Sequence, residues 1–530
     1  MSSPLAIFTP LFKLLPEVKS PTTPPTFSQK MVWTLLALII FYAMYNVAAL
    51  GVSSRLAQAN DFMQIVTASK MGSLLTTGIG PIVLASIFLQ LFVGAKILNV
   101  DLKDPEQKAQ FYGTQKILAV LLCLFEAYIY VFIGHLPLNS LFPGMEPAAA
   151  GLLDVTAAQA PYTAMLVMLQ IALGSLMLLF LDEVVSKHGI GSGISLFIAA
   201  GVSLSIVGGA GHIFTADNGI IALLLHNPGA EVMAQVILIL MPLFFTILVF
   251  LIVVYVEGLR VEIPLSFDRA RGVATGFPIK FTYVSNIPVI LAFALIANFS
   301  FVAMAMGGSV GAEPHFCLTG TQVPYTSPGY DYMSACRING NETGVDLVNI
   351  IGRATPSTTG SQARFVDGIL YYITPMGRPN TLDFGGYMSY ILSPDTKSPI
   401  FGIPEFGHVI IYIVFLMIVC VIFGQFWVET TGMGPKEVAE QLDSAGLQIP
   451  GFRRDPRVVT TLLEKYIPPI VVLGSAFVGL LAGVADLTGA LGTGTGILLT
   501  VSILYKFYQD IERQHVFETS ALMGSLFGKR

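Results

Sequence analysis

The sequence predicts an all-α polytopic membrane protein whose ten transmembrane helices form two inverted halves of five. Three observations lead to this fold class. Hydrophobic residues make up 54% of the 530-residue chain and charged residues only 12%, whereas soluble domains carry roughly 25% charged residues. Ten apolar segments are long enough to cross a bilayer, which takes roughly 20 residues. Finally, one glycine pattern recurs at the start of the fifth and the tenth segment.

The apolar segments follow one another along the chain with mostly short polar connections. The first is nearer a full membrane span than a signal-peptide core, so we expect no cleavage after it. From hydropathy we expect spans at residues 31–50, 74–94, 117–135, 161–181, 191–209, 232–256, 283–303, 408–427, 466–485 and 490–507.

The distribution of basic residues predicts how the chain is oriented. With the N-terminus in the cytosol, 21 of the 28 Lys and Arg residues fall on the cytosolic side. The short outer connections 136–160, 210–230 and 486–489 hold none, which is the bias that orients membrane proteins. We therefore expect a multi-pass protein of the cell membrane with both termini cytosolic. Its parts would be a cytosolic segment 1–30, a first half 31–209, an external connection 210–231, a second half 232–507 and a cytosolic tail 508–530.

The longest connection, residues 304–407, is the least membrane-like part of the chain and would be external. It contains Cys317 and Cys336, which can form a disulfide if the segment lies outside the cytosol. It also contains the sequon Asn341-Glu342-Thr343, an acceptor sequence for N-glycosylation outside the cytosol. Residues 365–373 are apolar enough to dip back toward the membrane as a re-entrant helix.

The glycine pattern that begins at Gly189 and recurs at Gly492 supports an internal repeat. Both copies read Gly-x-Gly-Ser/Thr-Gly-Ile. The first begins on the inner side and the second on the outer side, as an inverted repeat of five plus five helices requires. A phosphate-binding loop is the alternative, but neither copy is followed by the Lys of a P-loop. Glycines at these positions allow helix ends and backbones to approach closely.

A second group of glycines interrupts the second span, in Gly78-Ile79-Gly80-Pro81, and Pro288 interrupts the seventh. The preceding polar stretch, 61–72, is too charged and too short to cross the membrane. Irregular backbone at membrane depth persists only where it lines a cavity or packs within protein. This region therefore indicates an aqueous funnel that contains a short helix.

An inverted repeat with interrupted helices fits a secondary transporter for a small solute as well as a channel. Ion-coupled transporters retain several acidic or basic groups inside their spans, because these groups carry the coupling. Here Glu126 is the one clear acid well inside a span. Asn298 is its candidate partner, since each could satisfy the other in hydrocarbon. The small number of ionisable groups inside the spans favours a channel over an ion-coupled transporter.

Other function classes find no support in the sequence. A net charge of −5 without a basic domain gives no indication of nucleic acid binding. A His-Glu-x-x-His motif does not occur, and no two histidines are spaced to form a metal pair. We expect neither an enzyme nor a cofactor or metal.

Several separate stretches resemble the SecY-type protein translocase pore subunit, and more closely its archaeal and eukaryotic branch than its bacterial one. The resemblance spans the chain apart from the external loop. It rests on residues 67–72, 78–83, 181–194, 283–290 and 426–432, and on 489 onward.

The resemblance implies an hourglass pore between the two halves, pinched at mid-membrane by aliphatic side chains. By motif position this pore ring would be Ile79, Val83, Ile194, Ile198, Ile290 and Leu499. Taken singly, each is an apolar residue in an apolar helix and could be ordinary core. A plug, a short helix that blocks the funnel from outside, would occupy about 61–72. Its residues would include Asp61, Phe62, Ile65, Thr67, Ser69 and Lys70.

The resemblance also implies a lateral gate, between helices two and three on one side and seven and eight on the other. Glu126 and Asn298 would lie near it as a polar pair. Signal sequences and nascent polypeptides would be the substrates, a ribosome would dock on loops 257–280 and 428–465, and SecE-type and small beta-type subunits would clamp the halves. The docking residues would be Arg260, Arg269, Arg271, Arg453 and Arg454, although the inside-positive rule alone would also place them there.

The sequence departs from the family pattern in two places. The loop before the eighth span is far longer than the usual hairpin. Glu262 and Asp268 dilute the positive charge of the loop between spans six and seven. The first departure adds an external domain of unexplained role, and the second lowers the expected strength of ribosome binding.

Overall fold

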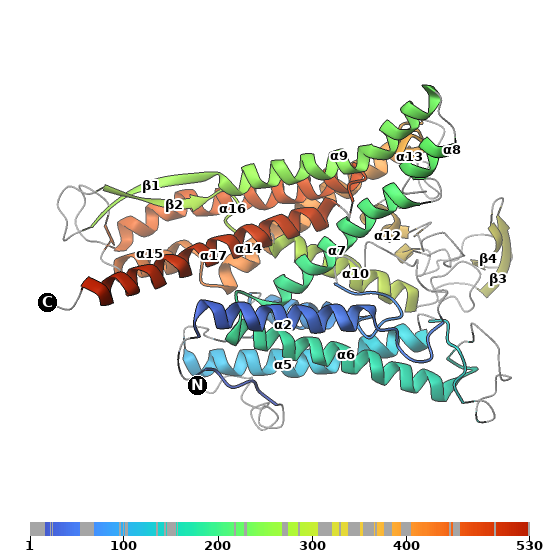
Figure 1. Ribbon diagram of the computed structural model, residues 1–530, viewed down its shortest axis with the longest axis horizontal. Coiled ribbons are helices and arrows are strands. Elements are labelled where there is room, and N and C mark those ends of the chain that lie inside the picture. Colours follow the sequence, from blue (N-terminus) through green and yellow to red (C-terminus); the bar gives the residue numbers. More distant parts are fainter. Residues whose placement is uncertain are drawn as a thin grey trace.

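The computed structural model of the chain is predominantly helical (Figure 1). It describes residues 16–21, 23, 25–53, 68–94, 97–98, 100, 104–133, 136–142, 145, 155, 157–216, 219–226, 230–267, 274–284, 287–305, 321–327, 330–337, 350–352, 365, 368–375, 384–393, 404–444, 447–448, 456–491 and 494–527.

Each of the ten expected spans corresponds to one helix. In the first half these are α2 (Phe27–Asn46), α4 (Gly80–Gly94), α5 (Pro105–Tyr128) with its π-helical extension η3 (Ile129–Ile133), α6 (Pro161–His188) and α7 (Gly193–Thr215). In the second half they are α9 (Ala230–Gly258), α10 (Ile287–Ala305), α14 (Glu405–Thr430), α16 (Pro456–Leu487) and α17 (Gly494–Phe527). A short helix, α8 (Ile220–His226), lies in the connection between the halves.

By length and composition, seven helices within the described part of the chain can cross a membrane, and α4 and α10 contain shorter apolar runs. The helix α4 begins at Gly80, six residues later than the hydropathy predicts, because the preceding residues are held in turns. Ala49 N donates to Gly72 O (2.9 Å) and Leu74 N donates to Val47 O (3.1 Å). These bonds satisfy backbone groups that a helix would otherwise have paired.

The two halves lie side by side and meet along two seams. Figure 1 shows α2, α5 and α6 on one side, α9, α16 and α17 on the other, and α7 crossing between them. One seam is formed where α7 packs against α17. The other is formed where α4 packs against α10 and α14.

The connections gather at opposite ends of the helices (Figure 1). At one end, β1 (Arg260–Phe267) and β2 (Ala274–Lys280) form an antiparallel ribbon, which lies near α15 (Pro435–Ser444). The two-residue strand β5 (Leu447–Gln448) pairs with the far end of β1. At the other end lie α12 (Gly368–Ile373), α13 (Phe384–Leu392) and the hairpin of β3 (Thr321–Ser327) and β4 (Tyr330–Arg337). The described parts of the long 304–407 loop therefore contain helices and a hairpin.

Candidate functional site

The six residues expected in the pore ring come together in one hydrophobic cluster between the halves. Four of them, Ile79, Val83, Ile198 and Leu499, are buried in it. Ile194 and Ile290 are partly buried and pack against it. The residues come from four places: the start of α4, and helices α7, α10 and α17. The cluster contains many more residues than these six, so the expected ring is only one part of it.

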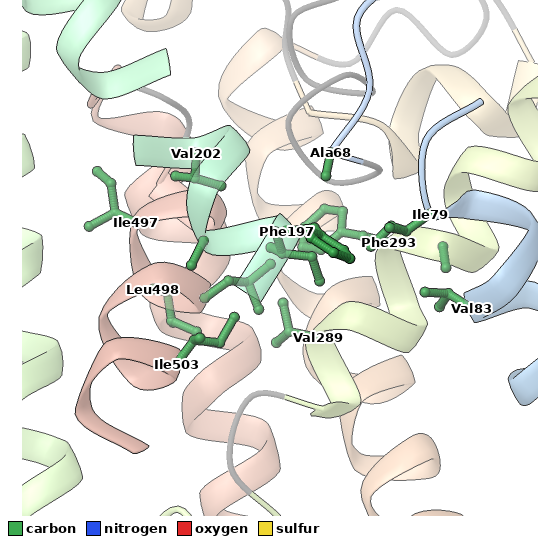
Figure 2. Close-up of a cluster of buried hydrophobic side chains, with 14 of the residues drawn as sticks. Ala68, Ile79, Val83, Phe197, Val202, Val289, Phe293, Ile497, Leu498 and Ile503 are labelled. Carbon is green, nitrogen blue, oxygen red and sulfur yellow. The ribbon is translucent and has the colours of Figure 1, made fainter. Parts of the chain in front are cut away.

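Aromatic side chains that the sequence reasoning missed lie at the centre of this cluster. Figure 2 shows Phe197 of α7 and Phe293 of α10 beside one another, with Val289 below them. Both phenylalanines are fully buried, and the Phe197 ring stacks on Phe41 of α2 with centroids 5.1 Å apart. Phe197 directly precedes Ile198, but an aliphatic motif gives no reason to select it.

Of the expected plug, the structure describes only the last part, from Ala68; Asp61, Phe62, Ile65 and Thr67 lie outside the described residues. Residues 68–72 form turns rather than helix. Ala68 is fully buried at the edge of the cluster (Figure 2) and has a φ of 49°, which only glycine adopts without strain.

The residues that follow Ala68 are tied to the first half. Ser69 is buried. Lys70 Nζ lies 3.3 Å from Asn46 Oδ1 and 5.6 Å from the centre of the Tyr45 ring, both at the end of α2. The hydroxyl of Ser73 donates to Lys70 O (2.7 Å) and accepts from Leu75 N (3.1 Å).

The turn before α4 packs closely on α6. The hydroxyls of Thr77 and Ser175 form a buried hydrogen bond. Beside it, Gly174 lies so near the backbone of Leu74 that a Cβ at position 174 would be 1.9 Å from Leu74 O. The position of Ile79 therefore depends on a glycine contact in a different helix.

The start of α7 is capped by a side chain from α6 rather than by its own N-cap residue. Ser192 makes no capping hydrogen bond, whereas Asp182 Oδ1 accepts from Ile194 N at 2.8 Å. The turn between the helices requires Gly191, which has a φ of 71°. This arrangement sets where α7 begins and therefore where Ile194 and Ile198 point.

Glu126 and Asn298 do not form the hydrogen bond expected of a polar pair. The amide nitrogen of Asn298 donates to Ala294 O in its own helix (2.7 Å). Glu126 is buried at the end of α5, and its Oε1 has no hydrogen-bond partner among the described residues. A buried acceptor without a partner is costly.

Of the expected docking residues, the structure describes Arg260, which is exposed and pairs in register with Lys280. Arg269, Arg271, Arg453 and Arg454 lie outside the described residues, as do Cys317 and the side chain of Cys336. The strand pairing adds a feature that the sequence did not indicate. Because β5 pairs with β1, described parts of the two loops 257–280 and 428–465 belong to one three-stranded sheet.

A buried carboxylate connects the base of this ribbon to α17. Glu257 accepts hydrogen bonds from Thr282 Oγ1 (3.3 Å) and from Ser502 Oγ (2.8 Å). It lines a small cavity with apolar residues of α9, α16 and α17. Nearby, Lys280 Nζ lies 2.8 Å from Gln509 Oε1. Ser502 is one helical turn from Leu499, so the ribbon base contacts the helix that carries one of the six residues expected in the ring.

Comparison with known proteins identifies the family. The SecY family model matches residues 73–508. The protein translocase subunit SecY of Methanocaldococcus jannaschii is 39% identical over 525 residues, covering 98% of this chain and 99% of that protein. The corresponding subunit of Pyrococcus furiosus is 36% identical, with 98% of each chain covered.

Solved structures agree in fold. A structure described as that of a protein conducting channel has a TM-score of 0.69 and 38% identity, covering 96% of this chain and 97% of the other. Sec61 in the canine ribosome-channel complex from the endoplasmic reticulum has a TM-score of 0.66 and 38% identity, with the same coverage. The similarity confirms the ten-helix fold class and the resemblance stated from the motifs. This chain belongs to the SecY family.

Proposed function

We propose that this chain is the pore-forming subunit of a protein-conducting channel, which passes unfolded secretory polypeptides across the membrane and releases transmembrane segments sideways into lipid. One observation carries the proposal. Six aliphatic residues from four separate places in both halves fall in a single apolar cluster at the contact between the halves. The cluster lies beside the glycine interruptions, where irregular backbone persists at membrane depth only if it lines a cavity or packs within protein.

The chemistry of this cluster suits a conduit for chains of any sequence. A narrow apolar constriction excludes ions because water leaves it. Aliphatic side chains make no fixed polar contact with a passing polypeptide, so they can move apart around it and close again. Ile79, Val83, Ile194, Ile198, Ile290 and Leu499 would form this constriction, with Phe197 and Phe293 filling it in the closed state.

The plug and the lateral gate belong to the same proposal. Residues 61–72 would block the funnel, and the burial of Ala68 in the cluster supports a closed position for the end of this segment. The gate would open where α4 meets α10 and α14, since this seam joins the two halves. Glu126 would help to set how hydrophobic a segment must be to open it, since its carboxyl is a buried polar group whose Oε1 has no partner among the described residues.

The ribbon β1–β2 with β5 would be the cytosolic docking surface for a ribosome. Sec61, a similar protein, has been solved in a ribosome-channel complex. Arg260, Arg269, Arg271, Arg453 and Arg454 would bind phosphates of ribosomal RNA. With the ribbon on the cytosolic side of the cell membrane, both termini would also be cytosolic. SecE-type and small beta-type subunits would complete the complex.

Ion conductance in a planar bilayer tests the proposal. The wild type should seal tightly, and deletion of residues 61–70 should give large, flickering currents. A tight seal in both proteins, together with saturable uptake of a small solute into liposomes, would instead indicate a transporter.

A further inference from the structure

A buried polar cluster lies at the end of α14 opposite the β1–β2 ribbon, and none of the roles described above uses it. Its centre is Glu405, which is 1% exposed, and His408, one turn along α14, is 2% exposed. Glu405 Oε1 accepts hydrogen bonds from the hydroxyl of Tyr371 in α12 and from that of Tyr390 in α13 (3.2 Å). One carboxylate therefore joins three helices.

His408 adds a second set of contacts. Its Nδ1 lies 3.3 Å from Glu405 Oε2. Its ring lies against those of Tyr371 and Tyr372, with centroids 4.5 Å and 5.6 Å apart. Both tyrosine rings are buried. Since a buried carboxylate is costly unless it is hydrogen-bonded, the hydroxyls of Tyr371 and Tyr390 fix the places of α12 and α13 on α14.

The position of α12 gives this cluster a mechanical consequence. The helix α12 packs against both α14 and α10, and α13 packs against α14 and α9. The helices α10 and α14 are the two that face α4 across the seam between the halves. The helix α12 therefore bridges the two helices of one side of that seam, and Glu405 holds it there.

We propose that Glu405 is a positioning residue of the lateral gate: through Tyr371 it fixes α12 as a brace that makes α10 and α14 move as one unit. The inference rests on the proposed channel function and adds to it which groups set the resistance of the gate. The helices α10 and α14 also pack directly on each other, and α12 adds a second connection between them. Without that connection the two helices separate more readily, so the seam opens more easily.

The test uses the purified full-length protein in a planar bilayer, with a synthetic signal peptide whose apolar core is a run of leucines. The current is measured against peptide concentration. Glu405→Leu and Tyr371→Phe should each lower the half-maximal peptide concentration at least threefold. The maximal current should stay unchanged, because no residue of the constriction is altered. Glu405→Gln keeps an acceptor oxygen for the tyrosines and should behave like the wild type.

Tyr412→Phe is the matched control. Tyr412 also lies on α14, one turn beyond His408, but its hydroxyl donates to Asp486 of α16 (2.8 Å) and not to the brace. This variant should leave the half-maximal concentration unchanged.

Two outcomes would overturn the brace: an unchanged half-maximal concentration in Tyr371→Phe, or an equal shift in Tyr412→Phe, which would indicate general loosening of α14. If the wild type gives no peptide-dependent current although the 61–70 deletion conducts, the protein is a channel without the proposed lateral gate. The role proposed for Glu405 is then refuted as well. Loss of folding in Glu405→Leu leaves Tyr371→Phe to decide, because that change removes a single hydroxyl.

Discussion

Substituting Gly174 by alanine tests whether the contact between α6 and the turn before α4 keeps the pore closed. A Cβ at position 174 would lie 1.9 Å from Leu74 O and 2.8 Å from Leu74 C. Ordinary van der Waals contact begins at 3.4 Å, so the turn must retreat by about 1.5 Å. The obstacle is backbone on both sides, which cannot rotate away as a flexible side chain would.

The displaced turn carries Thr77 and leads directly to Ile79 of the proposed constriction. We expect Gly174→Ala to lower the free energy of unfolding by about 1–3 kcal/mol, the usual cost of overpacking. We also expect it to raise the resting ion conductance, since Ile79 moves with the turn. Thermal unfolding in detergent and planar-bilayer recording measure the two effects.

Gly208→Ala is the control, because Gly208 is an exposed glycine of α7 whose Cβ would meet nothing within 4 Å. This variant should be at least as stable as the wild type, since alanine favours a helix over glycine by about 1 kcal/mol. If Gly174→Ala has the same unfolding midpoint and the same tight seal as Gly208→Ala, the argument from the close contact is wrong.

Three further predictions follow from polar contacts. Asp182→Ala removes the cap on Ile194 N and should cost about 0.5–2 kcal/mol of stability, while Asp182→Asn should recover most of it in the same thermal assay. Glu257→Leu leaves two buried hydroxyls without an acceptor and should cost about 1–3 kcal/mol; Glu257→Gln is its control, and equal midpoints would refute the role of the hydrogen bonds. Lys116→Met removes the 2.8 Å ion pair with Glu183 that joins α5 to α6. Because both groups are partly exposed, its cost should be at most about 1 kcal/mol and should shrink in high salt.

The number and order of the membrane helices could be predicted from the sequence because hydrocarbon imposes a strict local rule. Every backbone group must be paired within its own segment, so each span is a continuous apolar helix of predictable length. The starts of α7 and α17 were also visible, since both helices begin within the glycine pattern. The start of α4 was not, because the bonds that hold residues 72–74 in turns come from Val47 and Ala49.

The candidate site could be predicted only in part, because its residues were selected by their positions in sequence motifs. Motif positions selected six aliphatic residues, and the structure places all six in one cluster. The motif gave no indication of Phe197 and Phe293. The expected bond between Glu126 and Asn298 also illustrates the limit, since complementary chemistry does not establish that two side chains meet. The Asn298 amide found an acceptor four residues away in its own helix.

The sequence by itself determined that the chain is a membrane protein of ten helices in two related halves, because composition and hydropathy act locally and add along the chain. Only the tertiary structure decided which polar groups work together. Tyr371 and Glu405 meet although 34 positions separate them, and Glu257 meets Ser502 across 245 positions. Such pairs depend on how helices pack, and packing is a property of the whole chain rather than of any segment within it.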